Sequence, residues 1–386
     1  MKVALVHDWL TGMRGGERCL EAFLRLYPDA DVHTLIHVPG KTSALIDNRV
    51  RGTSWLNKLP AAGTLHRLFL PWYPSAARSL SLSGYDLVIS LSHAAAKNVT
   101  VDRTARHICY CFTPMRYIWD QAEQYFGPAH RGLWPLIRSL RRWDIAGSAG
   151  VSEFVAISRF IAARIRCYYG RPSSVIYPPV DASWITPVKE GTRGEAFLYA
   201  GALVPYKRPD VVVAAANRLG LPLWVVGGGP MERALRAQAG PTVKVLGRCS
   251  DEELASYYRR CRALILPGVE DFGMMPVECM AAGRPVIGRR FGGTADTIVA
   301  DGPHPTGVLI RGSRHQLSVE DLTEALERFM HTEDLFSVDA CTEQASRFSP
   351  SVFRDAWRTI VDGQEPCKEA GVYYPVGPDN NSIRGR

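Results

Sequence analysis

The chain has 386 residues, 46% of them hydrophobic and 22% charged, which is the composition of an ordinary globular protein with room for two hydrophobic cores. Its apolar runs stay well short of the roughly 20 residues that span a bilayer, and residues 1–10 are typical of a buried strand, so we expect neither a membrane-spanning helix nor a signal peptide. A formal net charge of +8 favours a polyanionic partner, such as nucleic acid, an anionic membrane surface or a phosphorylated ligand.

Segments typical of strands and of helices alternate almost from end to end, which predicts parallel sheets with crossover helices. In the first half we expect strands at residues 3–9, 31–36, 85–90, 106–112, 153–158 and 174–179. The second half repeats this plan, with strands expected at residues 197–202, 223–228, 243–247, 263–268, 285–290 and 306–311. The polar, turn-rich stretch 180–196 between the two series is the expected linker.

The predicted fold class is therefore α/β, with two Rossmann-like, doubly wound domains facing across a cleft. Ligands of open α/β sheets bind at the carboxyl ends of the strands, so these edges are where functional residues are expected. His7 and Asp8 lie within the first strand, and either form a polar pair at the cleft floor or a satisfied core pair.

Two N-terminal segments, residues 65–80 and 133–143, mix bulky apolar residues with arginines. This pattern is typical of helices that lie on anionic lipid. Buried helices with a solvated basic face explain the pattern equally well, so the sequence leaves both interpretations open.

In the second half, the motif YAGALVPYKRPD places Lys207 and Arg208 between a strand and a helix, where two cations could neutralise a diphosphate or simply form a solvated turn. The glycine-rich WVVGGGP that follows lacks the G-x-G-x-x-G spacing and fits a plain turn as well as a nucleotide contact. Ser250 and Glu253 of GRCSDEEL form a capping box, and the backbone at Arg248 could read a base.

The stretch GVEDFGMMPVECMAAG brings together two glutamates and a helix start. Glu270 is expected at a strand tip, Pro276 at the first helical position and Glu278 about a turn into the helix. The free N–H groups of residues 273–275 favour an anion or sugar oxygens. Carboxylates accept hydrogen bonds from hydroxyls, so the arrangement suits a nucleotide sugar, although solvated turn and helix residues would show the same spacing.

In this order, the motifs GALVPYKR, VVGGGP, LGRCSDEEL and PGVEDFGMMPVECMAAGRPVIG resemble glycosyltransferase family 4, whose members are retaining enzymes of the GT-B fold. HDWLTGMRGGERCLEAF, LVISLSHAAAKNV and CYCFTPMRYIWD are similar to the mannosyltransferases that build O-antigens and exopolysaccharides. The resemblance implies an acceptor-side domain at 1–185 and a nucleotide-sugar-binding domain at 186–349. It also implies that a helix at 350–362 crosses back to the first domain, and we expect the tail 363–386 to be poorly ordered.

Position by position, the resemblance implies that Glu270 contacts the transferred sugar, that Glu278 holds the ribose hydroxyls and that Lys207 binds the diphosphate. His93, just past a strand tip, would meet the sugar at the reaction centre. The other donor-binding residues implied are Gly15 and Gly16, in the loop after the first strand, Arg208, Arg248, Phe272, Gly273, Met274 and Met275. The residues implied on the acceptor side are Arg116, Tyr117 and Trp119.

Two positions depart from the family pattern. Ala202 stands where the family usually has an arginine, so the diphosphate clamp lacks one cation unless Arg208 or another arginine replaces it. Phe112 stands where histidine is expected in the most similar relatives, which affects the acceptor side. Without an Asp-x-Asp signature we expect no metal, and Lys207 would stabilise the leaving diphosphate while the acceptor attacks from the same face.

The function expected from this resemblance is transfer of a hexosyl residue, mannosyl from GDP-mannose, to a lipid-linked oligosaccharide or polysaccharide acceptor in surface polysaccharide synthesis. Nine scattered cysteines without a C-x-x-C pair are typical of reduced thiols, so we expect a cytoplasmic protein. Peripheral contact with the inner face of the cell membrane is a further expectation; no nucleic-acid partner or cofactor is expected. The alternatives are a nucleotide-sugar 2-epimerase of the same fold and a catalytically weak donor-binding subunit, which Ala202 favours.

Overall fold

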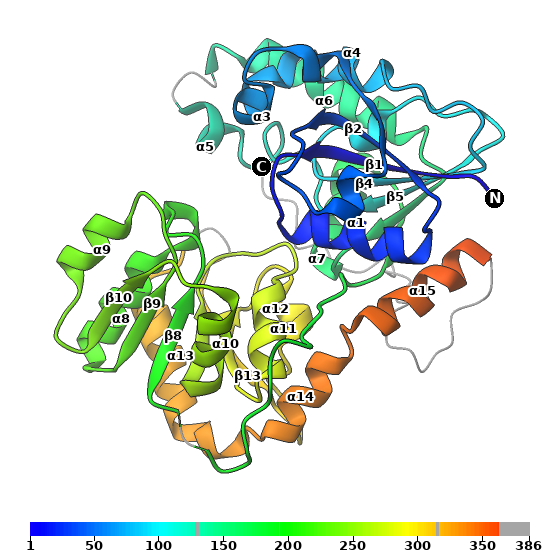
Figure 1. Ribbon diagram of the computed structural model, residues 1–386. Helices are drawn as coiled ribbons and strands as arrows, with labels where there is room; N and C mark the ends of the chain where they lie inside the picture. The colour runs from blue at the N-terminus through cyan, green and yellow to red at the C-terminus, as the bar shows by residue number, and fades with distance from the viewer. Residues whose placement is uncertain (128–130, 193, 314–315, 363–386) are drawn as a thin grey trace. The chain divides into compact units, whose positions relative to one another are not determined.

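The computed structural model shows two compact units, each built on a parallel sheet with helices packed around it (Figure 1). It describes residues 1–127, 131–192, 194–313 and 316–362, so the tail expected to be poorly ordered lies outside the described residues. Unit 1 comprises Met1–Pro179 and the chain from Arg354 onward, and unit 2 comprises Val180–Phe353. In the described part of the chain, no helix is both long enough and apolar enough to cross a bilayer.

Unit 1 contains, among the described residues, a seven-stranded sheet in the order β3-β2-β1-β4-β5-β6-β7. Its strands are β1 (Val3–Leu10), β2 (Asp31–His37), β3 (Val50–Thr53), β4 (Leu87–Ser92), β5 (Arg106–Cys111), β6 (Glu153–Ala156) and β7 (Ser174–Val175). Its helices are α1 (Gly15–Leu26), α2 (Ala44–Asp47), α3 (Ala62–Leu65), α4 (Tyr73–Arg78), α5 (Ala122–Phe126), α6 (Trp134–Ser148) and α7 (Arg159–Tyr169), with 3-10 turns η1 (Trp55–Lys58), η2 (His66–Trp72) and η3 (Ala96–Asn98). β1 and β4 are buried throughout, as expected for central parallel strands covered on both faces.

Unit 2 contains a six-stranded sheet in the order β10-β9-β8-β11-β12-β13, again counted over the described residues. Its strands are β8 (Ala196–Ala200), β9 (Leu223–Val226), β10 (Val243–Gly247), β11 (Cys261–Leu266), β12 (Val286–Arg289) and β13 (Gly307–Ile310). Its helices are α8 (Pro209–Leu219), α9 (Glu232–Gln238), α10 (Asp251–Arg260), α11 (Met274–Ala281), α12 (Thr294–Thr297), α13 (Val319–Thr332) and α14 (Val338–Ser346), with 3-10 turns η5 (Pro205–Lys207) and η6 (Glu333–Leu335).

The last described helix, α15 (Pro350–Asp362), begins in unit 2 and continues into unit 1. Its Trp357 is fully buried, with ring centroids 4.7 Å from Phe23 and 5.3 Å from Tyr110. The guanidinium of Arg106 donates to the carbonyl oxygens of Ile360 and Val361. The end of the chain that the structure describes is therefore part of the core of unit 1.

The alternation of strands and helices predicted from the sequence is confirmed, and all paired strands run parallel. The sequence missed β3, a four-residue edge strand without an apolar run that forms through pairing with β2. The strand expected at 174–179 ends at Val175, opposite Ala156, where its partner β6 also ends; Pro178 and Pro179 further along have no N–H group to donate to a neighbouring strand.

Two predicted helix starts were wrong. Gly15 and Gly16 were expected in a loop, but they are the first two residues of α1, where the side chain of Glu17 accepts from the backbone N–H of the N-cap residue Arg14 at 3.0 Å. Pro276 was expected at the first position of its helix and lies at the third, because Gly273, at φ 87°, turns the chain earlier. The capping box predicted at Ser250 and Glu253 is confirmed.

Acid should destabilise unit 1 through His107. Burial lowers the pKa of this histidine from 6.5 to about 4. The unfolded chain takes up a proton below pH 6.5 that the folded chain does not bind until about pH 4, so the free energy of unfolding should fall by about 3 kcal/mol across this window. Urea denaturation of wild type and His107→Gln at several pH values tests this, because the variant should lose less stability. Equal losses in both proteins would show that His107 does not carry the effect.

Candidate active site

Each sheet reverses its strand order at one place, where β1 lies beside β4 in unit 1 and β8 lies beside β11 in unit 2. Ligands of open α/β sheets bind outside the carboxyl ends of the strands at such a switch point. Three residues singled out from the sequence follow these strands: His93 comes after β4, Lys207 after β8 and Glu270 after β11. The topology thus brings one predicted residue to the switch point of unit 1 and two to that of unit 2.

The switch point of unit 1 is organised by Asp8, a fully buried carboxylate in β1. Its two oxygens accept hydrogen bonds from four successive backbone N–H groups, those of residues 93–96, at 2.6–2.9 Å. Burial acts to raise the pKa of Asp8, but the charge and hydrogen bonds of His93 outweigh it and hold that pKa well below its usual range. Asp8 therefore remains an anion that fixes the turn after β4.

The ring of His93 is oriented by the same carboxylate. Its Nδ1 lies 3.0 Å from Asp8 Oδ2, and its ring packs edge-on against Trp9 with centroids 4.4 Å apart. Because an ionised carboxylate only accepts, Nδ1 carries the hydrogen, and Nε2 is left to meet a ligand. With a side chain 24% exposed, His93 is held in place yet accessible from the carboxyl edge of the sheet.

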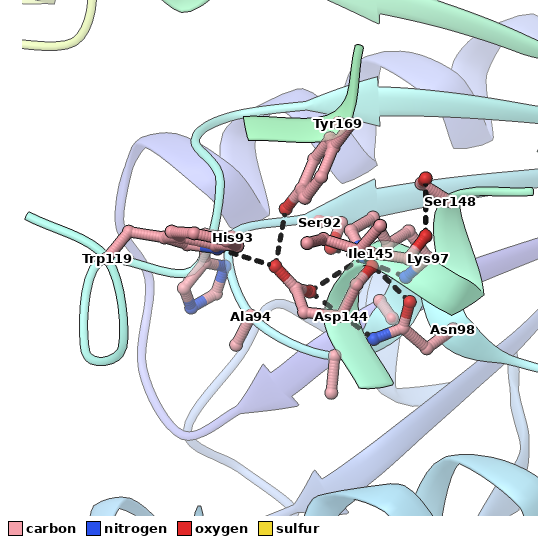
Figure 2. Close-up of polar contacts among 12 residues, drawn as sticks. Ser92, His93, Ala94, Lys97, Asn98, Trp119, Asp144, Ile145, Ser148 and Tyr169 are labelled. Atoms are coloured by element: carbon pink, nitrogen blue, oxygen red, sulfur yellow. Dashed lines mark hydrogen bonds and ion pairs between the residues drawn. The ribbon is translucent and has the colours of Figure 1, made fainter. Parts of the chain in front are cut away.

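A buried polar network lies beneath the His93 turn (Figure 2). Asp144 of α6 accepts from Lys97 Nζ at 2.7 Å, from Trp119 Nε1 at 2.8 Å and from the Tyr169 hydroxyl at 2.9 Å. Lys97 Nζ also donates to the Asp144 carbonyl and to Asn98 Oδ1. These three hydrogen bonds use all three hydrogens of the Lys97 ammonium group. The network ties the segment that carries His93 to helices α6 and α7.

His7 does not pair with Asp8, contrary to both interpretations of the sequence. Its Nδ1 faces the Trp9 carbonyl at 3.0 Å, and its buried Nε2 has no hydrogen-bond partner among the described residues. Burial is the main cause that lowers the pKa of His7, so the ring is neutral. A methyl group at Gly16 would lie 3.2 Å from both His7 Nε2 and the ring of Phe112, so the glycine allows the start of α1 to approach these rings.

The residues implied on the acceptor side lie in the segment after β5. Tyr117 is half-buried and packs edge-on against Tyr125, with centroids 4.5 Å apart, and Arg116 is half-buried beside it. The ring of Trp119 stacks on that of Tyr168, with centroids 4.6 Å apart, and its indole N–H donates to the Asp144 carboxylate. Trp119 therefore has a packing partner on one face and an internal acceptor for its only polar hydrogen.

At the switch point of unit 2, the structure joins the two residues that the sequence placed at separate strand tips. Lys207 Nζ and Glu270 Oε1 form a 3.0 Å ion pair, with side chains 22% and 26% exposed. The Glu270 carbonyl accepts from the Gly293 N–H at 2.7 Å, which fixes the turn after β11. Gly268 lies directly against the backbone of Lys207, so the two turns can approach closely. The pair is thus held on rigid elements.

Arg208 was expected to supplement Lys207 as a second cation for the diphosphate. In the structure its guanidinium contacts Asp210 at 3.1–3.3 Å and donates to the Leu317 carbonyl at 3.1 Å. Its backbone is left-handed at φ 53°, at the N-terminal end of α8. Ala202 contributes only its carbonyl, which accepts from the Tyr199 hydroxyl at 3.1 Å. The Arg208 guanidinium is therefore held by Asp210 and by the Leu317 carbonyl and is not directed beside Lys207.

Glu278 lies in α11 and is 6% exposed, with the Tyr258 hydroxyl donating to its Oε2 at 2.9 Å. Burial, followed by the charge of Glu278, raises the pKa of Tyr258. The amides expected to meet a ligand belong to the turn Phe272, Gly273, Met274 and Met275 at the start of α11, with the Phe272 ring buried against Phe348.

The glycine-rich turn after β9 is explained by packing. Gly227 and Gly229 have positive φ angles, 133° and 159°, and lie against the backbone of residues 201–203. The exposed side chain of Arg248 lies over Gly228, where a methyl group would come within 2.6 Å of its Nε. The structure thus places Arg248 beside the carboxyl end of β9, one strand away from Lys207.

Sequence reasoning missed two partners of its candidate residues, Asp8 for His93 and Tyr258 for Glu278. Each pair joins separate elements, 85 residues apart for Asp8 and 20 apart for Tyr258. An aspartate inside an otherwise apolar strand was the available signal, because a buried carboxylate requires hydrogen-bond donors.

Two family profiles together match residues 13–346 of the chain. The profile described as Glycosyltransferase Family 4 matches residues 13–184, and that described as Glycosyl transferases group 1 matches residues 183–346. An uncharacterized glycosyltransferase of Methanocaldococcus jannaschii is 32% identical over 188 residues, 47% of this chain and 51% of that protein. The O-antigen chain mannosyltransferase C of Escherichia coli is 29% identical over 151 residues, 37% of this chain and 40% of that protein. The matched segments thus span about half or less of these curated relatives.

Solved structures share the fold at low sequence identity. HepE of Anabaena, in complex with UDP and glucose, superposes with a TM-score of 0.67 at 17% identity, over 94% of this chain and 99% of that one. Sucrose-phosphate synthase of Thermosynechococcus elongatus gives a TM-score of 0.65 at 16% identity, over 94% of this chain and 100% of that one. The expected GT-B architecture, with two Rossmann-like units, is confirmed.

Proposed function

Because the chain belongs to the group 1 and family 4 glycosyltransferases, we propose that it transfers a hexosyl residue from a nucleotide sugar to an acceptor hydroxyl with retention of configuration. The observation that carries the proposal is the ion pair between Lys207 and Glu270 at the switch point of unit 2. A cation beside a carboxylate suits a ligand that is part phosphate and part polyol. The cation binds phosphate oxygens, and the carboxylate accepts hydrogen bonds from hydroxyls.

The proposed mechanism needs no cofactor or metal besides the nucleotide sugar. Cleavage of the sugar–phosphate bond leaves negative charge on the departing diphosphate, and Lys207 stabilises that charge from a position fixed before the reaction begins. Glu270 orients the sugar by accepting from its hydroxyls, and the acceptor hydroxyl attacks from the same face while the leaving phosphate takes its proton. In unit 1, His93 is oriented by Asp8 and keeps Nε2 available for a sugar hydroxyl.

The proposed donor is GDP-mannose, with GDP held through its ribose by Glu278. The similarity to the O-antigen mannosyltransferase supports a mannosyl donor, whereas HepE was solved with UDP and with UDP-glucose, so the base is the first property to test. Calorimetric titration with GDP and with UDP should show selective binding of GDP. Glu278→Ala should then weaken GDP binding about tenfold to a hundredfold, the effect of losing a charged hydrogen bond.

Tyr258→Phe is the matched control for that titration. It removes the internal hydrogen bond to Glu278 but keeps the carboxylate, so it should weaken GDP binding much less than Glu278→Ala. Equal losses in both variants would indicate that Glu278 acts through the packing of α10 on α11 and not through the ribose. Selective binding of UDP would show that the donor carries uracil and not guanine, and the assignment of Glu278 to the nucleotide site would still hold.

The proposed acceptor is a lipid-linked oligosaccharide or a polysaccharide, and the proposed location is the cytoplasm with peripheral contact at the inner face of the cell membrane. The similarity to an O-antigen chain enzyme supports a surface polysaccharide as the product. Arg116 and Tyr117 are the proposed acceptor contacts, because both lie in the segment that follows β5 and are partly accessible.

A second candidate, a catalytically weak donor-binding subunit, is favoured by one observation. Ala202 brings no cation to the diphosphate, and Arg208, which could replace it, contacts Asp210 and Leu317 instead. This candidate predicts nucleotide binding without turnover in the presence of a lipid-linked acceptor. Ala202→Arg would then raise donor affinity and start turnover, whereas an active wild-type protein would exclude this candidate.

A further inference from the structure

The segment 55–78 of unit 1 exposes several large apolar side chains close together in the sequence. Leu68 is 68% exposed, Trp72 50%, Leu65 42% and Trp55 36%. We call these four residues, with Lys58, Arg67 and Arg78 between and after them, the apolar–basic surface. They lie on η1, α3, η2 and α4, and Figure 1 shows α3 and α4 gathered with α6 at one end of the unit.

The segment beneath this surface is firmly packed, so its exposed side chains are not those of a frayed end. Leu70 and Tyr73 are buried in the same cluster as Ile137 and Leu140 of α6. The Tyr73 hydroxyl donates to the His66 carbonyl at 2.7 Å, which closes η2 onto the start of α4. Leu68 and Trp72 therefore project from a rigid support, and their exposure belongs to the fold.

The charge of the surface has one sign. Residues 48–85 contain no aspartate or glutamate and five lysine or arginine residues. Lys58, Arg67 and Arg78 are exposed, and none of the three pairs with a carboxylate in the part of the chain that the structure describes. On neighbouring α6, Trp134 is 45% exposed and Arg138 and Arg142 are exposed as well. Along residues 48–85, exposed apolar and cationic side chains therefore occur without an acidic residue between them.

We infer that the apolar–basic surface docks on an anionic lipid bilayer. Leucines that project between arginines can enter the acyl region, tryptophans favour the headgroup level, and arginines that have no carboxylate partner bind lipid phosphates. Protein interfaces also use tryptophan and arginine, so an acidic protein is the competing partner, and a wild-type chain that does not bind anionic vesicles would favour it. This inference rests on the proposed function in one respect: a lipid-linked acceptor would explain why the protein docks on a membrane. Binding to the bilayer does not itself require the transfer reaction.

The test is flotation of the full chain with vesicles of phosphatidylcholine and phosphatidylglycerol in equal parts, compared with phosphatidylcholine alone. Wild type should float with the anionic vesicles only. The double variant Leu68→Ser/Trp72→Ser should lower the bound-to-free ratio about tenfold or more. Arg67→Ser and Arg78→Ser should each lower it about fivefold. Raising the salt from about 0.1 M to about 1 M should weaken binding, since the Debye length falls from about 10 Å to about 3 Å.

Matched controls come from elsewhere in the chain. Leu335→Ser removes an apolar side chain that is 63% exposed in unit 2, and Arg103→Ser removes an exposed arginine outside the surface; both should float like wild type. Lys207→Ala should also float normally, so a failed transfer reaction is distinguishable from a failed docking surface. The inference is overturned if wild type ignores anionic vesicles or if the double variant floats as well as Leu335→Ser. Light scattering that shows a dimer dissolved by the double variant would overturn it in favour of self-association.

Discussion

Lys207→Ala and Glu270→Gln should each lower the turnover number of the proposed transfer about a hundredfold to a thousandfold, the range measured when one preorganised electrostatic contact to a developing charge is removed. Lys207→Ala removes the cation that faces the leaving diphosphate. Glu270→Gln keeps the shape of the side chain but loses the charge that holds Lys207 at 3.0 Å and accepts from the sugar. Initial rates with saturating donor and acceptor measure the effect, and the melting temperature shows whether each variant is folded.

The chain offers a closely matched control in the ion pair of Arg262 and Glu333. Their side chains are 22% and 35% exposed, against 22% and 26% for Lys207 and Glu270, and they belong to the same unit. Arg262 follows the first residue of β11 and is therefore at the end of the strand opposite to Glu270. Arg262→Ala should leave turnover within about twofold of wild type. A comparable loss in this variant would mean that turnover follows the stability of unit 2 rather than chemistry at the switch point.

The order of strands and helices was predictable because each parallel strand is a short apolar run between turn-forming residues. The positions of Lys207 and Glu270 were also predictable, since each lies in the turn that follows such a run. Their contact was not, because it depends on β8 and β11 being neighbours, and strand order is a property of the whole sheet. The same reason explains why Asp8 was noticed but assigned to the wrong histidine.

Arg208 shows a local signal that the sequence analysis did not use. Asp210 follows it by two residues, and the structure pairs the two side chains at 3.1 Å. A carboxylate this close in sequence competes with any ligand for the guanidinium. Short strands were the other weakness, because β3 has only four residues and is stabilised by its neighbour rather than by its own composition.

Asp144→Ala should lower the free energy of unfolding by about 3–5 kcal/mol, because it leaves the buried ammonium of Lys97 without its counter-charge. Asp144 and Lys97 are 0% and 2% exposed, and the hydroxyl of Tyr169 and the indole N–H of Trp119 would lose their acceptor as well. Urea denaturation followed by circular dichroism measures the change. Asp301→Ala, which removes an exposed aspartate, should change stability by about 0.5 kcal/mol or less.

The double variant Lys97→Met/Asp144→Leu separates stability from positioning. Removing both charges avoids an unpaired buried ion, so its loss of stability should be smaller than the sum of the single losses. The segment 93–98 would nevertheless lose its ties to α6, including the contacts from Lys97 to Asp144 at 2.7 and 2.8 Å. Since the four amides that bind Asp8 belong to this segment, His93 would lose its fixed orientation, and turnover should fall further than stability. Wild-type turnover in a stable double variant would show that the network only packs the core of unit 1.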